Sequence, residues 1–175
     1  MLRTTQKLVM AAVITAFVGA PMLAQDGGAV SFSMRSVSGN TVTSDSLRGE
    51  VVVLAFGASW LPLSKTQLEG VRKLADEYSD RGVAVFWVST ESEDSKSKNY
   101  ASDAQLKAFS QKYGLKVTVL RDPDGQISRK FGVDQLPSII ILDKNGNAVG
   151  EPIGGLDPQG NLAGQLAKHL DRVLQ

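Results

Sequence analysis

The 175 residues contain no cysteine and only one histidine. Without a thiol the chain can form no disulfide and offers no sulfur ligand to zinc or to an iron–sulfur cluster. Catalysis by a cysteine nucleophile is excluded for the same reason, because the thiolate is the attacking group in that chemistry. The formal net charge is only +1, so the sequence lacks the basic excess that binds nucleic acid, and we expect no nucleic-acid partner.

The residues that are present fit one globular domain. Hydrophobic residues make up 42% of the chain and charged residues 21%, which supplies a packed core and rules out a disordered protein. No set of His, Asp and Glu has metal-ligand spacing, and His169 stands in an amphipathic stretch, as surface residues do. The acidic stretch Glu91–Asp94 is typical of a solvated loop. We therefore predict no metal and no cofactor.

The first 24 residues have the pattern of a signal peptide. Arg3 and Lys7 form a short basic region, an apolar run follows, and Ala24 is a small residue suited to cleavage. We therefore expect export, to a bacterial periplasm. The alternative is an uncleaved N-terminal membrane anchor, although the apolar run is shorter than the about 20 residues of a typical span. Contact with a membrane is expected only in that case.

The mature chain divides into an N-terminal extension, residues 25–50, and a main domain, residues 51–175. The extension alternates polar and apolar residues well enough for a small β-hairpin. In the main domain two continuous apolar runs, Val51–Phe56 and Val83–Val88, predict strands buried on both faces. An amphipathic helix with Ser59 as its N-cap is expected between them, which makes a right-handed strand–helix–strand unit.

The second half of the chain predicts further elements. Ser102 and Gln105 form a capping box that opens a helix. Additional elements are expected in this order: a strand at 117–120, a short helical turn through Ile127 and Phe131, a strand at 138–142, a return strand beginning at 148–150 and a last helix capped by Asp157 with Pro158 in its first turn. We therefore predict an α/β fold in which helices flank a central mixed sheet.

A sequence motif lies where the first buried strand meets its helix. Residues 55–65 are Ala-Phe-Gly-Ala-Ser-Trp-Leu-Pro-Leu-Ser-Lys. The N-terminus of a helix presents free N–H groups and a positive dipole end, so a cysteine at this place would have a depressed pKa and be reactive. Here the position holds Leu61, and Ser64 follows one turn later.

This segment resembles the active site of thioredoxin-like proteins, in particular the exported TlpA/redoxin (AhpC/TSA-like) group. Their motif is F-W-A-x-W-C-x-x-C-[RK]. The residues of that motif kept in this chain are Phe56, Ala58, Trp60, Pro62 and Lys65. Leu61 and Ser64 stand where the two cysteines belong.

A second stretch strengthens the resemblance. Residues 131–138, with Leu136 and Pro137, are similar to the family's Y-G-V-x-x-x-P-T. The resemblance implies a thioredoxin-like fold in which the Leu136–Pro137 bond is cis and lies against the motif. It would also imply thiol–disulfide exchange, which requires a thiolate. Ser64 has no redox cycle and Leu61 is inert, so we assign no catalytic residue.

The peptide-binding surface of the family can be retained in a chain that lacks the catalytic cysteines. Relatives of this kind bind extended peptide over the active-site Trp and the backbone before the cis-proline, a mode that suits strand addition. The binding residues expected here are Trp60, Leu61, Pro62, Leu63, Ser64, Leu136 and Pro137. We predict a non-catalytic module that binds a protein or peptide. One alternative is a family-type thiol-disulfide oxidoreductase or antioxidant that acts only through a partner's thiols or by a different chemistry. The other is an accessory subunit of a cell-envelope complex.

Overall fold

A computed structural model describes residues 28–155 and 161–175, so the signal segment lies outside the described residues. The central strand of the main five-stranded sheet is β3 (Val51–Gly57), which is buried at every position. This strand pairs in parallel with β4 (Val83–Ser89) and antiparallel with β6 (Ser138–Leu142). Beyond them lie β5 (Thr118–Arg121) and β7 (Ile153–Gly154), giving the order β5-β4-β3-β6-β7.

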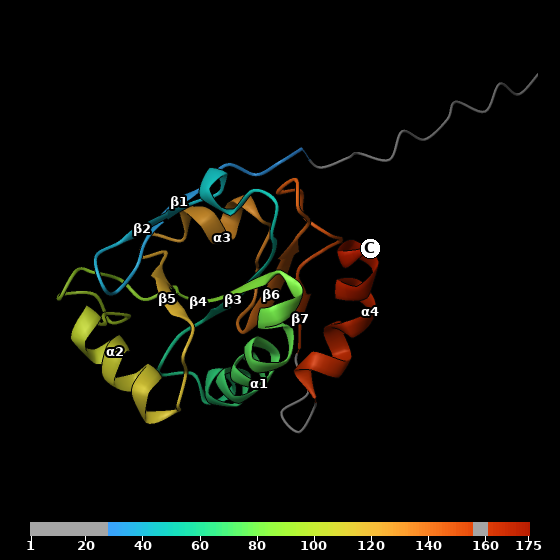
Figure 1. Cartoon of the computed structure of the whole chain (residues 1–175). Coiled ribbons are helices and arrows are strands. Elements are labelled where there is room, and N and C mark those ends of the chain that lie inside the picture. The colour runs from blue at the N-terminus through green and yellow to red at the C-terminus, as the bar shows by residue number, and fades with distance from the viewer. Residues whose placement is uncertain (1–27, 156–160) are drawn as a thin grey trace, which may run out of the picture.

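Helices cover both faces of this sheet (Figure 1). On one face lie α1 (Pro62–Tyr78) and α4 (Leu162–Leu174), which pack against each other. On the other lie the short α3 (Gln126–Lys130) and the hairpin of β1 (Ser33–Arg35) and β2 (Thr41–Thr43). The expected α/β architecture with a mixed sheet and an N-terminal hairpin is therefore present.

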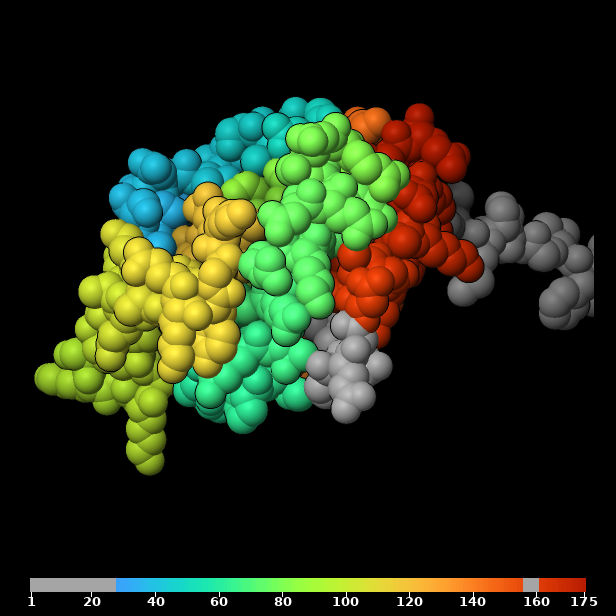
Figure 2. Space-filling view, turned by 60° about the horizontal axis from the view of Figure 1, so that its bottom comes forward, coloured from blue at the N-terminus to red at the C-terminus, as the bar shows by residue number. Residues whose placement is uncertain are grey.

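The remaining helix, α2 (Asp103–Lys112), lies beside β5 and begins as the sequence predicts. The Gln105 N–H donates to the Ser102 hydroxyl at 3.2 Å, and the Gln105 side chain accepts from the Ser102 N–H at 2.8 Å. In Figure 2, α1 (green) crosses this side of the molecule between the yellow segment that includes α2 and the red α4.

The sheet separates two hydrophobic cores because successive strand residues point to opposite faces. Val53 belongs to the core beneath α1 and α4, and its neighbour Leu54 belongs to the core that contains Phe32 and Phe131. The N-terminal hairpin is thus part of the packed structure. Within the described residues, no helix combines the length and the apolar character needed to cross a bilayer.

Three expected boundaries need correction. The first long helix begins at Pro62 with Leu61 as N-cap, and Ser59 does not cap it, because the Ser59 hydroxyl is bonded elsewhere. The expected return strand contacts β6 only briefly, through the bridge of Ala148 with Leu142 and the bond from the Val149 N–H to the Ile141 carbonyl at 2.8 Å, and regular pairing resumes at β7. The last helix begins at Leu162 after Asn161, while the predicted cap and proline at 157–158 lie outside the described residues.

Candidate functional site

The motif lies at the end of β3, where the chain turns into α1. Leu61 is the extended residue that precedes the helix, and Ser64 is the third residue of its first turn. Phe56, near the end of β3, pairs with Ser138 at the start of β6. This register brings the Leu136–Pro137 bond, which is cis, beside the motif.

Between the two segments lies an open cleft of about 460 Å³. Trp60 and Leu61 line it from the motif, Val133 and Leu136 line it from the segment before β6, and Thr90 closes the end next to β4. Arg129 and Asp134 add one charge of each sign. The cleft is therefore apolar where the motif meets Leu136 and has charged groups at its margin.

The site residues expected from the sequence divide into an exposed and a buried set. Trp60 is 61% exposed and Leu63 is 45% exposed, which is unusual for side chains of this size. Pro62 is also exposed, and Leu61 and Leu136 are half-buried. Trp60, Leu61 and Leu136 line the cleft, whereas Pro62 and Leu63 lie outside its lining. We call these five exposed or half-buried residues the cleft surface.

Ser64 and Pro137 are buried, so they lie beneath the cleft surface and cannot offer side chains to a partner. The Ser64 hydroxyl instead accepts the N–H of Ala58 at 3.1 Å. This buried bond joins the two ends of the segment between β3 and the first turn of α1. Ser64 is thus a hydrogen-bonded part of the interior.

A buried glutamine supports the cleft from below. The Gln67 amide donates to the carbonyls of Phe56 at 3.2 Å and Ser138 at 3.3 Å, and its oxygen accepts from the Trp87 indole at 3.3 Å. A methyl group on Gly57 would lie 2.9 Å from that oxygen, so this position, a Trp in the family motif, has no room for a side chain here. The role of Gln67 was not predicted from the sequence, although this residue lies on the same buried face of α1 as Val71.

The expectation of a fully solvated acidic loop is wrong for Glu91, which is 1% exposed. Its carboxylate accepts the N–H of Ser59 at 3.0 Å, the Ser59 hydroxyl at 2.6 Å and the Ser89 hydroxyl at 2.9 Å. A carboxylate this deep needs such partners, because burial without them is costly. Glu91 therefore holds the residue next to Trp60, a role that no local sequence pattern shows.

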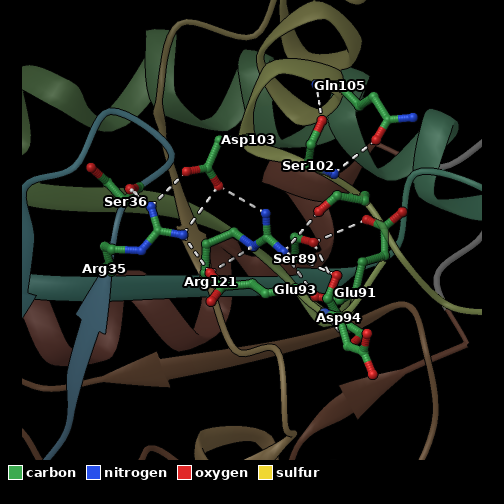
Figure 3. Close-up of polar contacts among 12 residues, drawn as sticks. Arg35, Ser36, Ser89, Glu91, Glu93, Asp94, Ser102, Asp103, Gln105 and Arg121 are labelled. Carbon is green, nitrogen blue, oxygen red and sulfur yellow. Dashed lines mark hydrogen bonds and ion pairs between the residues drawn. The ribbon is translucent and has the colours of Figure 1, made fainter. Parts of the chain in front are cut away.

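An ion-pair network joins the N-terminal hairpin to the start of α2, and it contacts Glu91 through the backbone carbonyl of that residue (Figure 3). Arg121 of β5 is buried and donates to Asp103 at 2.9 Å and to the Glu91 carbonyl at 3.1 Å. Arg35 of β1 donates to Asp103 at 2.6 Å and pairs with Glu93. The hydrogen bond from Arg35, with the nearby charge of Arg121, holds the pKa of Asp103 below its ordinary value despite partial burial.

The ionisable groups near the cleft do not cluster into a metal site among the described residues. Among residues 28–155 and 161–175, no three His, Cys, Asp or Glu side chains are grouped to hold a metal ion. His169 lies on α4 and is not among the residues that line the cleft. The chemistry available at the cleft surface is contact with apolar groups and hydrogen bonding.

Comparison with known proteins identifies the family. The model of the AhpC/TSA family matches residues 27–149. The chain belongs to this family. It is 27% identical over 140 residues to the thiol-disulfide oxidoreductase ResA of Bacillus thuringiensis, covering 80% of this chain and 75% of the relative. It is 31% identical over 117 residues to the thioredoxin-like protein YneN of Bacillus subtilis, and the match covers 66% of this chain and 63% of the relative.

A solved structure confirms the thioredoxin-like fold. The thiol:disulfide interchange protein of Chlorobium tepidum, a thioredoxin family protein, superposes with a TM-score of 0.68 at 20% identity, covering 87% of this chain and 99% of that one. The 175 residues of this family member contain no cysteine, and Leu61 and Ser64 lie at the start of α1.

Replacing both residues with cysteine, Leu61→Cys with Ser64→Cys, should create a reducible disulfide. The two positions share one helical turn, in which the Ser64 N–H donates to the Leu61 carbonyl at 3.1 Å, and the helix N-terminus lowers the pKa of a thiol there. Thiol titration after mild oxidation, with each single variant as control, measures the product. Two thiols that stay free after oxidation would show that the motif is misplaced.

Asp103→Asn should lower the free energy of unfolding at pH 7. The pKa of Asp103 is depressed in the folded chain, so its stabilising effect is present above the unfolded pKa and is lost as the pH falls through the folded value. The difference from wild type should be constant from neutral pH down to about 5 and shrink below about 4. Urea denaturation across this range measures it, with exposed Asp80→Asn as control, and a difference independent of pH would contradict the account.

Proposed function

We propose that this protein is an exported, non-catalytic member of the AhpC/TSA family that binds an extended peptide segment of another protein in the cleft between Trp60 and Leu136. The observation that carries the proposal is the 61% exposure of Trp60 at the margin of that cleft. An exposed aromatic ring beside half-buried leucines is typical of a contact surface, because such rings contribute large apolar area on binding.

The chemistry of the cleft favours binding over turnover. Thiol–disulfide exchange needs a thiolate, and none of the 175 residues is cysteine. Leu61 adds apolar surface at the position of the lost nucleophile, next to Trp60. The names of the relatives describe oxidoreductases, and this chain has the scaffold without the groups that perform that reaction.

The shape of the cleft favours an extended segment with an apolar side chain. The segment that ends at Leu136 runs into β6, so its backbone lies at the start of that strand beside the cleft. A peptide that runs along this backbone would place one side chain over Trp60 and Leu61, and backbone pairing would supply affinity without dependence on sequence. Arg129 and Asp134 would then lie near its polar groups.

Export rests on the N-terminal sequence. The basic residues Arg3 and Lys7, the apolar run and Ala24 form the pattern of a secretory signal. A cleaved chain recovered from the periplasmic fraction would support this location, and a full-length chain confined to the cytoplasm would contradict it.

Leu61→Arg should weaken binding of a short extended peptide with a central leucine by at least about tenfold, which corresponds to about 1.4 kcal/mol. The added charge would be desolvated against the apolar part of the cleft. Titration of the Trp60 fluorescence measures affinity, and Trp60→Phe supplies the background from the buried Trp87.

Two controls make this test specific. Ala108→Arg adds the same charge at an exposed position of α2 that does not line the cleft, and it should bind the peptide as wild type does. A peptide with serine in place of leucine should bind less tightly to wild type. Equal affinity of Leu61→Arg and wild type would show that the peptide binds elsewhere.

A further inference from the structure

The segment 90–101, which joins β4 to α2 and which we call the insert, contacts the motif at two successive residues. Glu91 accepts both the N–H and the hydroxyl of Ser59. Asn99, at the other end of the insert, accepts the indole N–H of Trp60 at 2.6 Å. The exposed ring of Trp60 is therefore held by a residue far along the chain.

Asn99 is itself fixed on several sides. Its side-chain amide donates to the Thr90 carbonyl at 3.1 Å, while its side-chain oxygen accepts from Trp60. Its backbone carbonyl accepts the Ser92 N–H at 2.6 Å, and its own N–H donates to the Ser97 hydroxyl at 3.2 Å. These bonds orient the acceptor oxygen toward the indole and fix the Asn99 side chain relative to the rest of the insert.

The insert in turn is fastened to the sheet by Arg121. This buried guanidinium donates to the carbonyls of Glu91 at 3.1 Å and Ala101 at 2.9 Å, which lie at opposite ends of the insert. It also donates to Asp103, the first residue of α2 (Figure 3). One buried side chain thus closes the insert into a loop of defined shape.

We propose that Asn99 is a positioning residue that clamps Trp60 in its exposed orientation and determines which groups the cleft can recognise. The binding consequence rests on the proposed function. Because the indole N–H is already bonded to Asn99, Trp60 has no donor left for a ligand and offers only its ring. The cleft should therefore select an apolar side chain over a hydrogen-bonding one.

The clamp should also raise affinity by holding the ring in place before the peptide arrives. Ordering one mobile side chain on binding weakens an interface by an amount that corresponds to about two- to tenfold in affinity. Because Trp60 is already fixed in the free protein, the entropy cost of ordering its ring is part of the free energy of folding and does not weaken binding. Without the Asn99 acceptor, the ring should be mobile in the free protein, and its ordering on binding should lower the affinity.

The clamp can be tested without any ligand, from the indole N–H resonances of the two tryptophans in ¹⁵N-labelled protein. Trp60→Phe assigns the Trp60 signal. Asn99→Ala should shift this signal and speed its exchange with water, whereas Asn99→Asp keeps an acceptor oxygen and should retain slow exchange. Lys98→Ala changes the exposed neighbour in the insert and should leave the signal in place. An unchanged Trp60 signal in Asn99→Ala overturns the clamp.

Affinity for the leucine and serine peptides tests the consequence. Asn99→Ala should bind the leucine peptide about two- to tenfold more weakly and discriminate less against serine. Unchanged affinity and selectivity alongside a shifted indole signal would overturn the role of Asn99 in recognition. If wild type binds neither peptide, the proposed function fails, and the indole signal still decides whether Asn99 clamps Trp60.

Discussion

The site depends on the antiparallel pairing of β3 with β6. Phe56 lies opposite Ser138 in this register, which is why the motif after β3 and the cis bond before β6 meet although they are far apart in the sequence. Gln67 reinforces the pairing, because its amide donates to the carbonyls of these same two residues. A slip of one residue would turn every side chain of β6 from one face of the sheet to the other. The two cores therefore fix the geometry of the cleft.

The two residues that the motif resemblance aligns with cysteines have different environments. The buried Ser64 uses its hydroxyl to satisfy the Ala58 N–H, so a polar side chain there is compatible with the interior. Leu61, at the surface, extends the apolar area next to the exposed ring of Trp60. In the proposed function, this apolar area on the family scaffold serves as contact surface for a peptide. The charge network of Arg35, Asp103 and Arg121 stabilises the insert that borders it.

Local periodicity predicted most of the fold. Apolar runs predicted β3 and β4, and the capping box of Ser102 predicted the start of α2, because these signals depend only on near neighbours. The resemblance predicted where the motif and the cis bond would meet. Sequence could not predict the partners of Glu91 or the bond between Asn99 and Trp60, which depend on how the insert folds back over the motif. The wrong N-cap at Ser59 has the same cause, because its hydroxyl is bonded to Glu91.

The central claim is that the cleft surface, without thiols, binds an extended apolar peptide. A map of backbone amide shifts during titration of ¹⁵N-labelled protein with the leucine peptide tests it most directly. The account predicts saturable shifts concentrated at Trp60, Leu61 and Leu136, with α4 unchanged. Shifts that cluster elsewhere in the molecule, or none at peptide concentrations that saturate comparable peptide-binding domains, would contradict it.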